Sequence, residues 1–165
     1  MSDAPTTLLE FEHIVQVNDP LKSLSTPISR AQLWRGLVLR ARCPQRFIEG
    51  MQCFSHPQEG DTFVREISAG EANFYEDVTL REESAIHTTT HSDKPQIFAQ
   101  SETTIEEPES GALFVRFSYR REMPDAHSAV DVAEHLKAAY RQLDTDAVGL
   151  IRLMAEDDSF DAPLN

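Results

Sequence analysis

The feature that most constrains the fold is a run of short β-type segments between residues 51 and 121, interrupted by turn sequences about every ten residues. The segments are rich in Thr, Val, Ile, Phe and Tyr, and the turns lie at residues 57–61, 69–71, 82–84, 92–95 and 107–111. Connections this short join antiparallel neighbours, because a parallel crossover needs a dozen or more residues. The region therefore predicts a meander of six antiparallel strands.

One strand and two short helices are predicted before this meander. Over residues 8–19, apolar side chains at the odd positions alternate with mostly polar ones, which is the period of a half-buried strand. Ser29 and Gln32 have the spacing of a capping box, and helical periodicity follows them. Pro44 cannot continue that helix but can begin another, so residues 44–48 predict a second short helix.

A long helix is predicted after residue 124, with Ser128 as its cap and Asp131 in its first turn. Its apolar stripe comprises Val132, Leu136, Tyr140, Leu143, Ala147, Leu150, Ile151 and Met154. At the α-helical rise the stripe is roughly 40 Å long, enough to cross a whole sheet. Gly149 interrupts it, either to allow close packing or at the start of a frayed final turn.

The order of elements predicts an α+β fold in which a seven-stranded, curved antiparallel sheet wraps around the long C-terminal helix. The sheet needs cover on its apolar face, and that helix is the largest element available. Helix and sheet touch along a line, so the flared parts of the sheet are covered poorly. We expect a cavity of roughly 300 to 1,000 Å³ there.

Composition and charge limit the partners. Lys and Arg number 15 against 28 Asp and Glu, for a formal net charge of -13, so nucleic acid and anionic lipid are repelled. We expect one domain over residues 1–165, with an ordered core at about 8–156 and a solvated acidic tail at 157–165. The oligomeric state is not predicted.

The chain carries no signal for a membrane or an oxidising compartment. It shows no leader pattern and no apolar run near the roughly 18 residues of a membrane helix. We therefore expect a cytoplasmic protein without membrane insertion. Cys43 and Cys53 are the two cysteines, and they are expected to be reduced thiols.

Two stretches resemble a known family. They are residues 29–41, followed by Pro44 and Phe47, and residues 106–119. In these stretches and in element order the chain resembles the START-like superfamily, also called SRPBCC, whose fold is the helix-grip fold, and within it the little-characterised AtaL-like family. The resemblance implies binding of a hydrophobic ligand and supplies no catalytic residue.

His13 is the sharpest single candidate for a functional residue. It lies in the middle of the apolar face of the first strand, between Phe11 and Val15. A polar group placed there needs a partner, which is either a ligand or another side chain.

Glu76 is a second candidate, since it lies between Phe74 and Val78. If it faces inward, it has a raised pKa or a cationic neighbour such as Arg65, and it could serve as a general acid or base. The alternative is a register shifted by one, which places Glu76 in water and turns Tyr75 inward.

Alternation along the last two strands predicts their inner faces. The inner sets are Ile97, Ala99, Ser101, Thr103 and Ile105 on one strand and Leu113, Val115, Phe117 and Tyr119 on the other. The predicted ligand-binding residues are Phe11, His13, Val15, Trp34, Glu76, Ser101, Thr103, Val115, Phe117, Tyr119, Leu136 and Tyr140. Trp34 and Tyr140 have helical spacing to other apolar residues, which is more typical of a core than of a binding site.

No metal or cofactor is predicted. On a strand, His87 and His91 share a face roughly 13 Å apart, too far to bind one metal ion. Cys43, Cys53 and His56 do not make the four compact ligands of a zinc site. No glycine-rich phosphate loop and no Gly-x-Ser-x-Gly motif occurs in the sequence.

Three functions remain open from the sequence. The first is a module that binds a small hydrophobic molecule in the cavity. The second is a cofactor-free acid–base enzyme of cyclase, dehydratase or hydrolase type, using His13 with Glu76 or Tyr140. The third is a protein-interaction domain with a filled interior.

Overall fold

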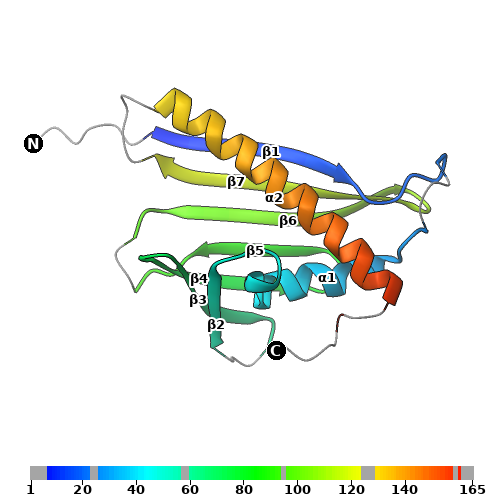
Figure 1. Ribbon diagram of the computed structural model, residues 1–165, viewed down its shortest axis with the longest axis horizontal. Coiled ribbons are helices and arrows are strands. Elements are labelled where there is room, and N and C mark those ends of the chain that lie inside the picture. Colours follow the sequence, from blue (N-terminus) through cyan, green and yellow to red (C-terminus); the bar gives the residue numbers. More distant parts are fainter. Residues whose placement is uncertain are drawn as a thin grey trace, which may run out of the picture.

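The computed structural model describes residues 7–22, 26–56, 60–93, 96–123, 129–157 and 160. Among these, seven strands form one antiparallel sheet in the spatial order β1-β7-β6-β5-β4-β3-β2 (Figure 1). The strands are β1 Thr7–Gln16, β2 Met51–His56, β3 Thr62–Ala69, β4 Ala72–Arg81, β5 Ala85–Thr90, β6 Ala99–Glu109 and β7 Ala112–Met123. The predicted meander of six strands is confirmed, and β1 joins it by pairing with β7.

The register of the sheet places the predicted apolar sets on one face. Across β1 and β7, Phe11 lies opposite Tyr119 and His13 lies opposite Phe117. Phe117 is 1% exposed, as the inward prediction requires. Ile97 is the exception: it precedes β6 and is half exposed, because the strand begins two residues later.

The capping box at the start of α1 (Arg30–Arg42) is confirmed. Ser29 Oγ accepts a hydrogen bond from the Gln32 amide, and Gln32 Oε1 accepts one from the Ser29 amide. The second short helix is a single 3₁₀ turn, η1 (Pro44–Arg46). It goes no further because the chain turns at Gly50, with φ at +82°, into β2 at once.

The long helix α2 (Ala129–Asp157) crosses the inner face of the sheet diagonally (Figure 1). Ala147, Ile151 and Met154 from the predicted stripe are buried, and Val148 joins them. Leu143 of the same stripe is partly exposed. The predicted cap Ser128 lies outside the described residues.

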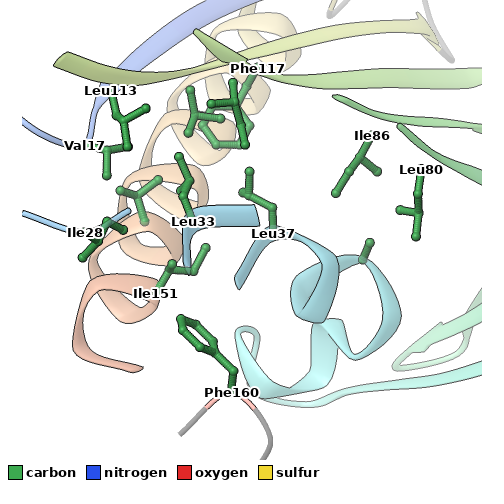
Figure 2. Packing of buried hydrophobic residues seen from close by; sticks show 14 of the residues in the cluster. Val17, Ile28, Leu33, Leu37, Leu80, Ile86, Leu113, Phe117, Ile151 and Phe160 are labelled. Carbon is green, nitrogen blue, oxygen red and sulfur yellow. The ribbon is translucent and has the colours of Figure 1, made fainter. Parts of the chain in front are cut away.

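The main core lies where α1 fits between the sheet and the C-terminal half of α2. Figure 2 shows Leu33 and Leu37 of α1 beside Ile151 of α2, with Phe117 of the sheet above them. Fully burying side chains of this size contributes about 1.5–3 kcal/mol each relative to exposure. Phe160, in the predicted solvated tail, is 5% exposed and belongs to this core. The remainder of that tail, apart from Asp157, lies outside the described residues.

The glycine at which the helices pack closely is Gly36 on α1. A Cβ atom at Gly36 would lie 2.4 Å from Ile151 Cγ2, whereas one at Gly149 would meet nothing within 4 Å. α2 also continues from Gly149 to Asp157. Both explanations predicted for Gly149 are therefore wrong.

None of the described helices combines the length and apolar character needed to cross a membrane.

Candidate functional site

A partly open cavity of about 210 Å³ lies between the inner face of the sheet and the helices α1, η1 and α2. Its apolar wall includes Leu37, Ile48, Met51, Ile67, Ile86 and Leu143. It is smaller than the predicted range because two tyrosines and two arginines project into the same space. The main core of Figure 2 lies beside it, and α2 contributes Tyr140, Leu143 and Asp144 to the cavity wall.

Hydroxyl groups line the cavity on two adjacent strands. Thr88 of β5 is paired with Ser101 of β6, and Thr103 lies two residues further along β6. Because side chains alternate across a strand, the residues between them point to the outer face. The predicted inward orientation of Ser101 and Thr103 is confirmed.

Asp144 of α2 forms the polar centre of the cavity wall. Its carboxylate has no exposed surface and accepts three hydrogen bonds. Arg40 Nη2 donates to Oδ1 at 2.8 Å, while His13 Nε2 and the Tyr119 hydroxyl donate to Oδ2 at 2.7 and 2.5 Å. One side chain of α2 thereby joins β1, β7 and α1, and its charge is compensated by the guanidinium.

Aromatic rings surround this cluster on the side of β1. Tyr119 and Tyr140 stack with centroids 4.0 Å apart, and Phe11 lies against both. His13 stacks between Phe11 and Phe117, at 5.4 and 5.3 Å. These contacts fix the plane of the imidazole, so His13 is held as a structural donor to Asp144.

Burial raises the pKa of the Tyr119 hydroxyl, and the neighbouring Asp144 carboxylate raises it further. Ionising this group would place a second negative charge beside the first in a site with little water. Tyr119 therefore stays protonated at neutral pH, as its role as a donor to Asp144 requires.

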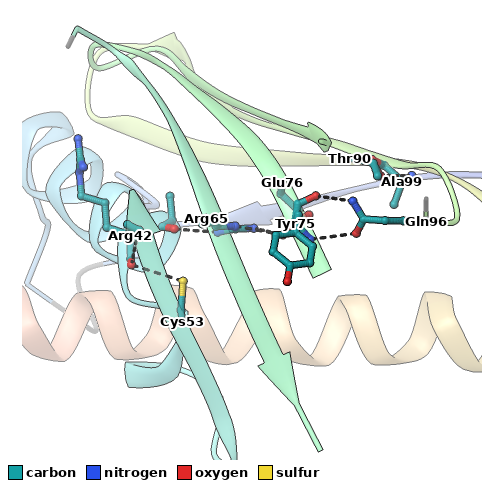
Figure 3. Close-up of polar contacts among 10 residues, drawn as sticks. Arg42, Cys53, Arg65, Tyr75, Glu76, Thr90, Gln96 and Ala99 are labelled. Carbon is teal, nitrogen blue, oxygen red and sulfur yellow. Dashed lines mark hydrogen bonds and ion pairs between the residues drawn. The ribbon is translucent and has the colours of Figure 1, made fainter. Parts of the chain in front are cut away.

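A second, half-buried ion pair borders the cavity on the opposite side. Arg65 of β3 contacts Glu76 of β4 through Nε and Nη2, each 3.1 Å from Oε1, and donates from Nη1 to the carbonyl of Ala41 at 2.8 Å. Figure 3 shows the Arg65 and Glu76 side chains on neighbouring strands. Of the two readings for Glu76, the inward one with Arg65 as its cationic neighbour is confirmed.

The last turn of α1 is also attached to the edge of the sheet. The carbonyl of Arg42 accepts a hydrogen bond from Ser55 Oγ at 3.0 Å and a weaker one from Cys53 Sγ at 3.8 Å (Figure 3). Burial raises the pKa of the Cys53 thiol. Cys43 and Cys53 are free cysteines, as expected.

The structure brings four of the predicted site residues to the cavity: Ser101, Thr103, Tyr119 and Tyr140. His13 and Glu76 do not line the cavity but contact residues that do: His13 contacts Asp144 and Glu76 contacts Arg65. The others, Phe11, Val15, Trp34, Val115, Phe117 and Leu136, are not part of the cavity lining. Five of these pack in or against the core or the aromatic stack, because the cavity lies nearer to β5 and β6 than to β1.

The sequence analysis did not predict the aliphatic wall or Thr88 as part of the site, and it missed two charged residues, Arg40 and Asp144. Asp144 carried a signal, since it lies four residues after Tyr140 and three before Ala147 and so falls on the apolar stripe of the helix. Arg40 carried none, because a lysine or arginine near the end of a helix is ordinary.

Of the two histidines predicted to be too far apart for one metal ion, His91 has carboxylate partners. His91 Nδ1 lies 2.8 Å from Asp77 and Nε2 lies 3.2 Å from Asp93. In the described ranges, no three His, Cys, Asp or Glu side chains are grouped so that they could hold a metal ion.

Solved structures share this architecture at very low sequence identity. The di-domain ARO/CYC protein StfQ from the steffimycin biosynthetic pathway aligns with a TM-score of 0.69 and 8% identity, over 92% of this chain and 52% of its own. The di-domain ARO/CYC protein BexL covers similar shares, 90% and 50%. The chain thus spans about half the length of these two proteins, and at such identity the likeness shows the fold alone.

Two further structures match along nearly their whole length. The Zhui aromatase/cyclase from Streptomyces sp. R1128 has a TM-score of 0.63 and 12% identity, with 94% of this chain and 98% of that one covered. Norcoclaurine synthase from Thalictrum flavum has a TM-score of 0.63 and 10% identity, with 93% and 99% covered.

A search of curated proteins gave no match. A family comparison matched residues 15–158, a range that includes Arg40, Tyr119 and Asp144 but not His13. The strand order and the long C-terminal helix give the helix-grip fold, which these solved structures share. The chain belongs to the AtaL family, described as acetylaranotin biosynthesis cluster protein L.

Proposed function

We propose that this protein binds a small, largely hydrophobic molecule in the cavity between the sheet and α2. The observation that carries the proposal is the division of the cavity wall. Aliphatic side chains line one part, and the hydroxyls and ionic groups around Arg40, Tyr119 and Asp144 line another. Such a wall combines apolar burial with a few polar groups that fix orientation, as small-molecule sites do.

A mainly apolar guest would gain most of its binding free energy from burial against the aliphatic part of the wall. Burial contributes about 25 cal/mol per Å² of apolar surface, from which the costs of association are subtracted. The open space also argues against the third hypothesis, an interaction domain with a filled interior. Structures with this fold support the proposal: they include aromatase/cyclases and a norcoclaurine synthase in complex with a transition state analogue.

A matched pair of variants on β6 tests the binding site. Thr103 lines the cavity, and Thr104 follows it on the other face of the strand. With 2-naphthol as the probe, isothermal calorimetry is expected to show binding to the native protein and to Thr104→Phe. Thr103→Phe, which fills the cavity, is expected to lose it. Equal affinity in both variants, with folds confirmed by circular dichroism, would place the probe elsewhere and reject the proposal.

A cofactor-free acid–base enzyme is the second candidate, and one observation favours it. Tyr140 lines the cavity, stacked on Tyr119 with ring centroids 4.0 Å apart, so its phenolic side chain lies near a bound molecule, whereas the Tyr119 hydroxyl is engaged with Asp144. The earlier pairing of His13 with Glu76 is not supported, because they have different partners and lie four strands apart in the sheet. If the protein converts a bound molecule, a turnover rate that falls at least tenfold in Tyr140→Phe, with the affinity for 2-naphthol unchanged, would favour the enzyme over the binding module.

A further inference from the structure

The two arginines that border the cavity use their donors differently. Arg65 engages all three guanidinium nitrogens, two with Glu76 and one with the carbonyl of Ala41. Each of its three nitrogens is therefore already used to hold β3, β4 and α1 together, although one N–H on Nη1 and one on Nη2 remain. Arg65 is thus held more firmly than a guanidinium that is bound through a single nitrogen.

Arg40 keeps donors for a guest. Within the described residues its hydrogen bond is made by Nη2 to Asp144, and its guanidinium carbon lies 5.8 Å from the centroid of the Phe117 ring. A guanidinium has five N–H donors, so those on Nε and Nη1 remain. The side chain is 19% exposed and lines the cavity.

Asp144 cannot supply the missing acceptors. Both of its oxygens are occupied, Oδ1 by Arg40 and Oδ2 by His13 and Tyr119. N–H donors that face a partly open cavity are met by water or by the oxygen atoms of a guest. Two parallel N–H groups match a carboxylate best, because that pairing is planar and bidentate.

The volume of the cavity limits the size of the guest. An apolar cavity of about 150 Å³ is known to bind benzene, and this one is about 210 Å³. One ring fits, and a second fused ring fills the remaining space. An extended chain or a compound of several rings would have to protrude through the open side of the cavity.

We propose that the cavity binds a flat carboxylic acid of one or two rings, with its carboxylate on Arg40 and its rings against Ile67 and Ile86. This inference rests on the proposed function, because it specifies the guest of the same cavity. Asp144 acts as the positioning residue: it fixes the guanidinium and leaves Nε and Nη1 directed to the guest. Because Asp144 offsets the positive charge of Arg40, charge alone attracts an anion only weakly. An anion must therefore also fit the shape of the cavity in order to bind.

Two probes of the same shape test the charge requirement. 2-Naphthoate and its neutral amide, 2-naphthamide, are titrated into the native protein by calorimetry at neutral pH. We expect the acid to bind at least fivefold more tightly. The variant Arg40→Met/Asp144→Asn removes both charges together, so no buried carboxylate is left unpaired, and its acid-to-amide ratio is expected to fall to about one.

Two control variants test whether the preference for the acid depends on Arg40 itself or on the positive charge of any arginine. Arg120→Met removes an exposed guanidinium paired with Glu10 and is expected to keep the preference. Arg65→Met/Glu76→Gln removes the half-buried pair and is expected to change both affinities by the same factor. If the double variant of Arg40 does not fold, Arg40→Lys, which keeps the charge but not the paired donors, is expected to reduce the ratio at least twofold.

The outcomes distinguish the two proposals. Equal binding of acid and amide to the native protein, or a preference that survives in both Arg40 variants, overturns the inference and leaves cavity binding intact. A ratio that falls equally in the Arg65 variant also overturns it. Failure of both naphthyl probes and of 2-naphthol to bind rejects the proposed function itself.

Discussion

At the scale of residues, the molecule depends on how a carboxylate is kept in its interior. An ionised side chain with no exposed surface costs several kcal/mol unless donors surround it. Asp144 has donors from three separate elements, at 2.5 to 2.8 Å. Each donor is held in turn, His13 by ring stacking and Tyr119 by burial and Tyr140. The cluster therefore contributes rigidity to the cavity wall.

Asp144→Asn is expected to lower the free energy of unfolding by about 3 kcal/mol, because removing one member of a buried ion pair leaves the other uncompensated. Urea denaturation followed by circular dichroism measures this. Asp146→Asn is the control, since Asp146 is exposed two residues later and bonds Gln142 on the same helix. Its effect is expected within about 0.5 kcal/mol. Equal losses in the two variants would contradict the role of Asp144.

His91 gives a prediction for pH dependence. Its hydrogen bond to Asp77 is the main cause that raises its pKa above the ordinary value of 6.5, and Asp93 contributes less. Because the folded pKa is raised, the stabilisation by this contact is fully present below pH 6.5 and is lost as pH rises through the folded value.

The titration of the His91 ring protons by NMR measures that shift. The midpoint is expected above 6.5 in the native protein and lower in Asp77→Asn. Asp93→Asn is expected to lower it by a smaller amount. A midpoint unchanged in Asp77→Asn would refute the assignment.

Sequence reasoning located His13 on the inner face because alternation along a strand is a local property, whereas for Glu76 it left an inward and an outward register open. Of their two hydrogen-bonding partners, the sequence predicted one and not the other. Arg65 was expected for Glu76, since neighbouring strands of a meander bring such residues together. Asp144 was not expected for His13, because 131 residues separate the two and the pairing depends on how α2 crosses the sheet.

At the scale of elements, the contact between α1 and α2 is set by one missing side chain. Gly36 lets Ile151 approach so closely that a Cβ atom would lie 2.4 and 2.6 Å from two of its carbons. Ile151 cannot turn aside, since it is β-branched and stiff at χ1. The position of α2 over the sheet, and with it that of Asp144, follows from this approach.

Gly36→Ala is therefore expected to destabilise the protein by about 1–3 kcal/mol, because overpacking exceeds the gain in helix propensity. Gly149→Ala is expected to stabilise it by up to about 1 kcal/mol, since the added methyl group is free of contacts. Chemical denaturation of both variants checks the opposite signs. Recovery of stability in Gly36→Ala/Ile151→Ala, relative to Ile151→Ala alone, would attribute the loss to this contact.

The elements themselves were predictable because their signals are local: the capping box of α1, the turn sequences of the meander and the stripe of α2. The length of η1 was not, since it depends on where β2 begins. Nor was the close approach at Gly36, because a glycine inside a helix has the same local signal whether it is packed or, like Gly149, exposed.

At the scale of the whole molecule, the charge of -13 opposes the compact state through repulsion between acidic groups. Screening by salt relieves this repulsion. We expect the melting temperature to rise by a few degrees between 10 and 200 mM NaCl, where 1 kcal/mol corresponds to about 2–4 °C for a chain of this size. Scanning calorimetry measures it. A falling melting temperature would show that the surface ion pairs outweigh the net charge.

The cluster around Asp144 also has a consequence for how the chain reaches its native state. His13, Arg40 and Tyr119 precede Asp144 by 131, 104 and 25 residues, so they meet their shared acceptor only after the whole sheet and most of α2 have been synthesised. Until then the concave face of the sheet has no cover and is open to association with other chains. Contacts between residues so distant in sequence also slow folding. The docking of α2 is thus a late event during synthesis, in which the interior closes and its charges are compensated together.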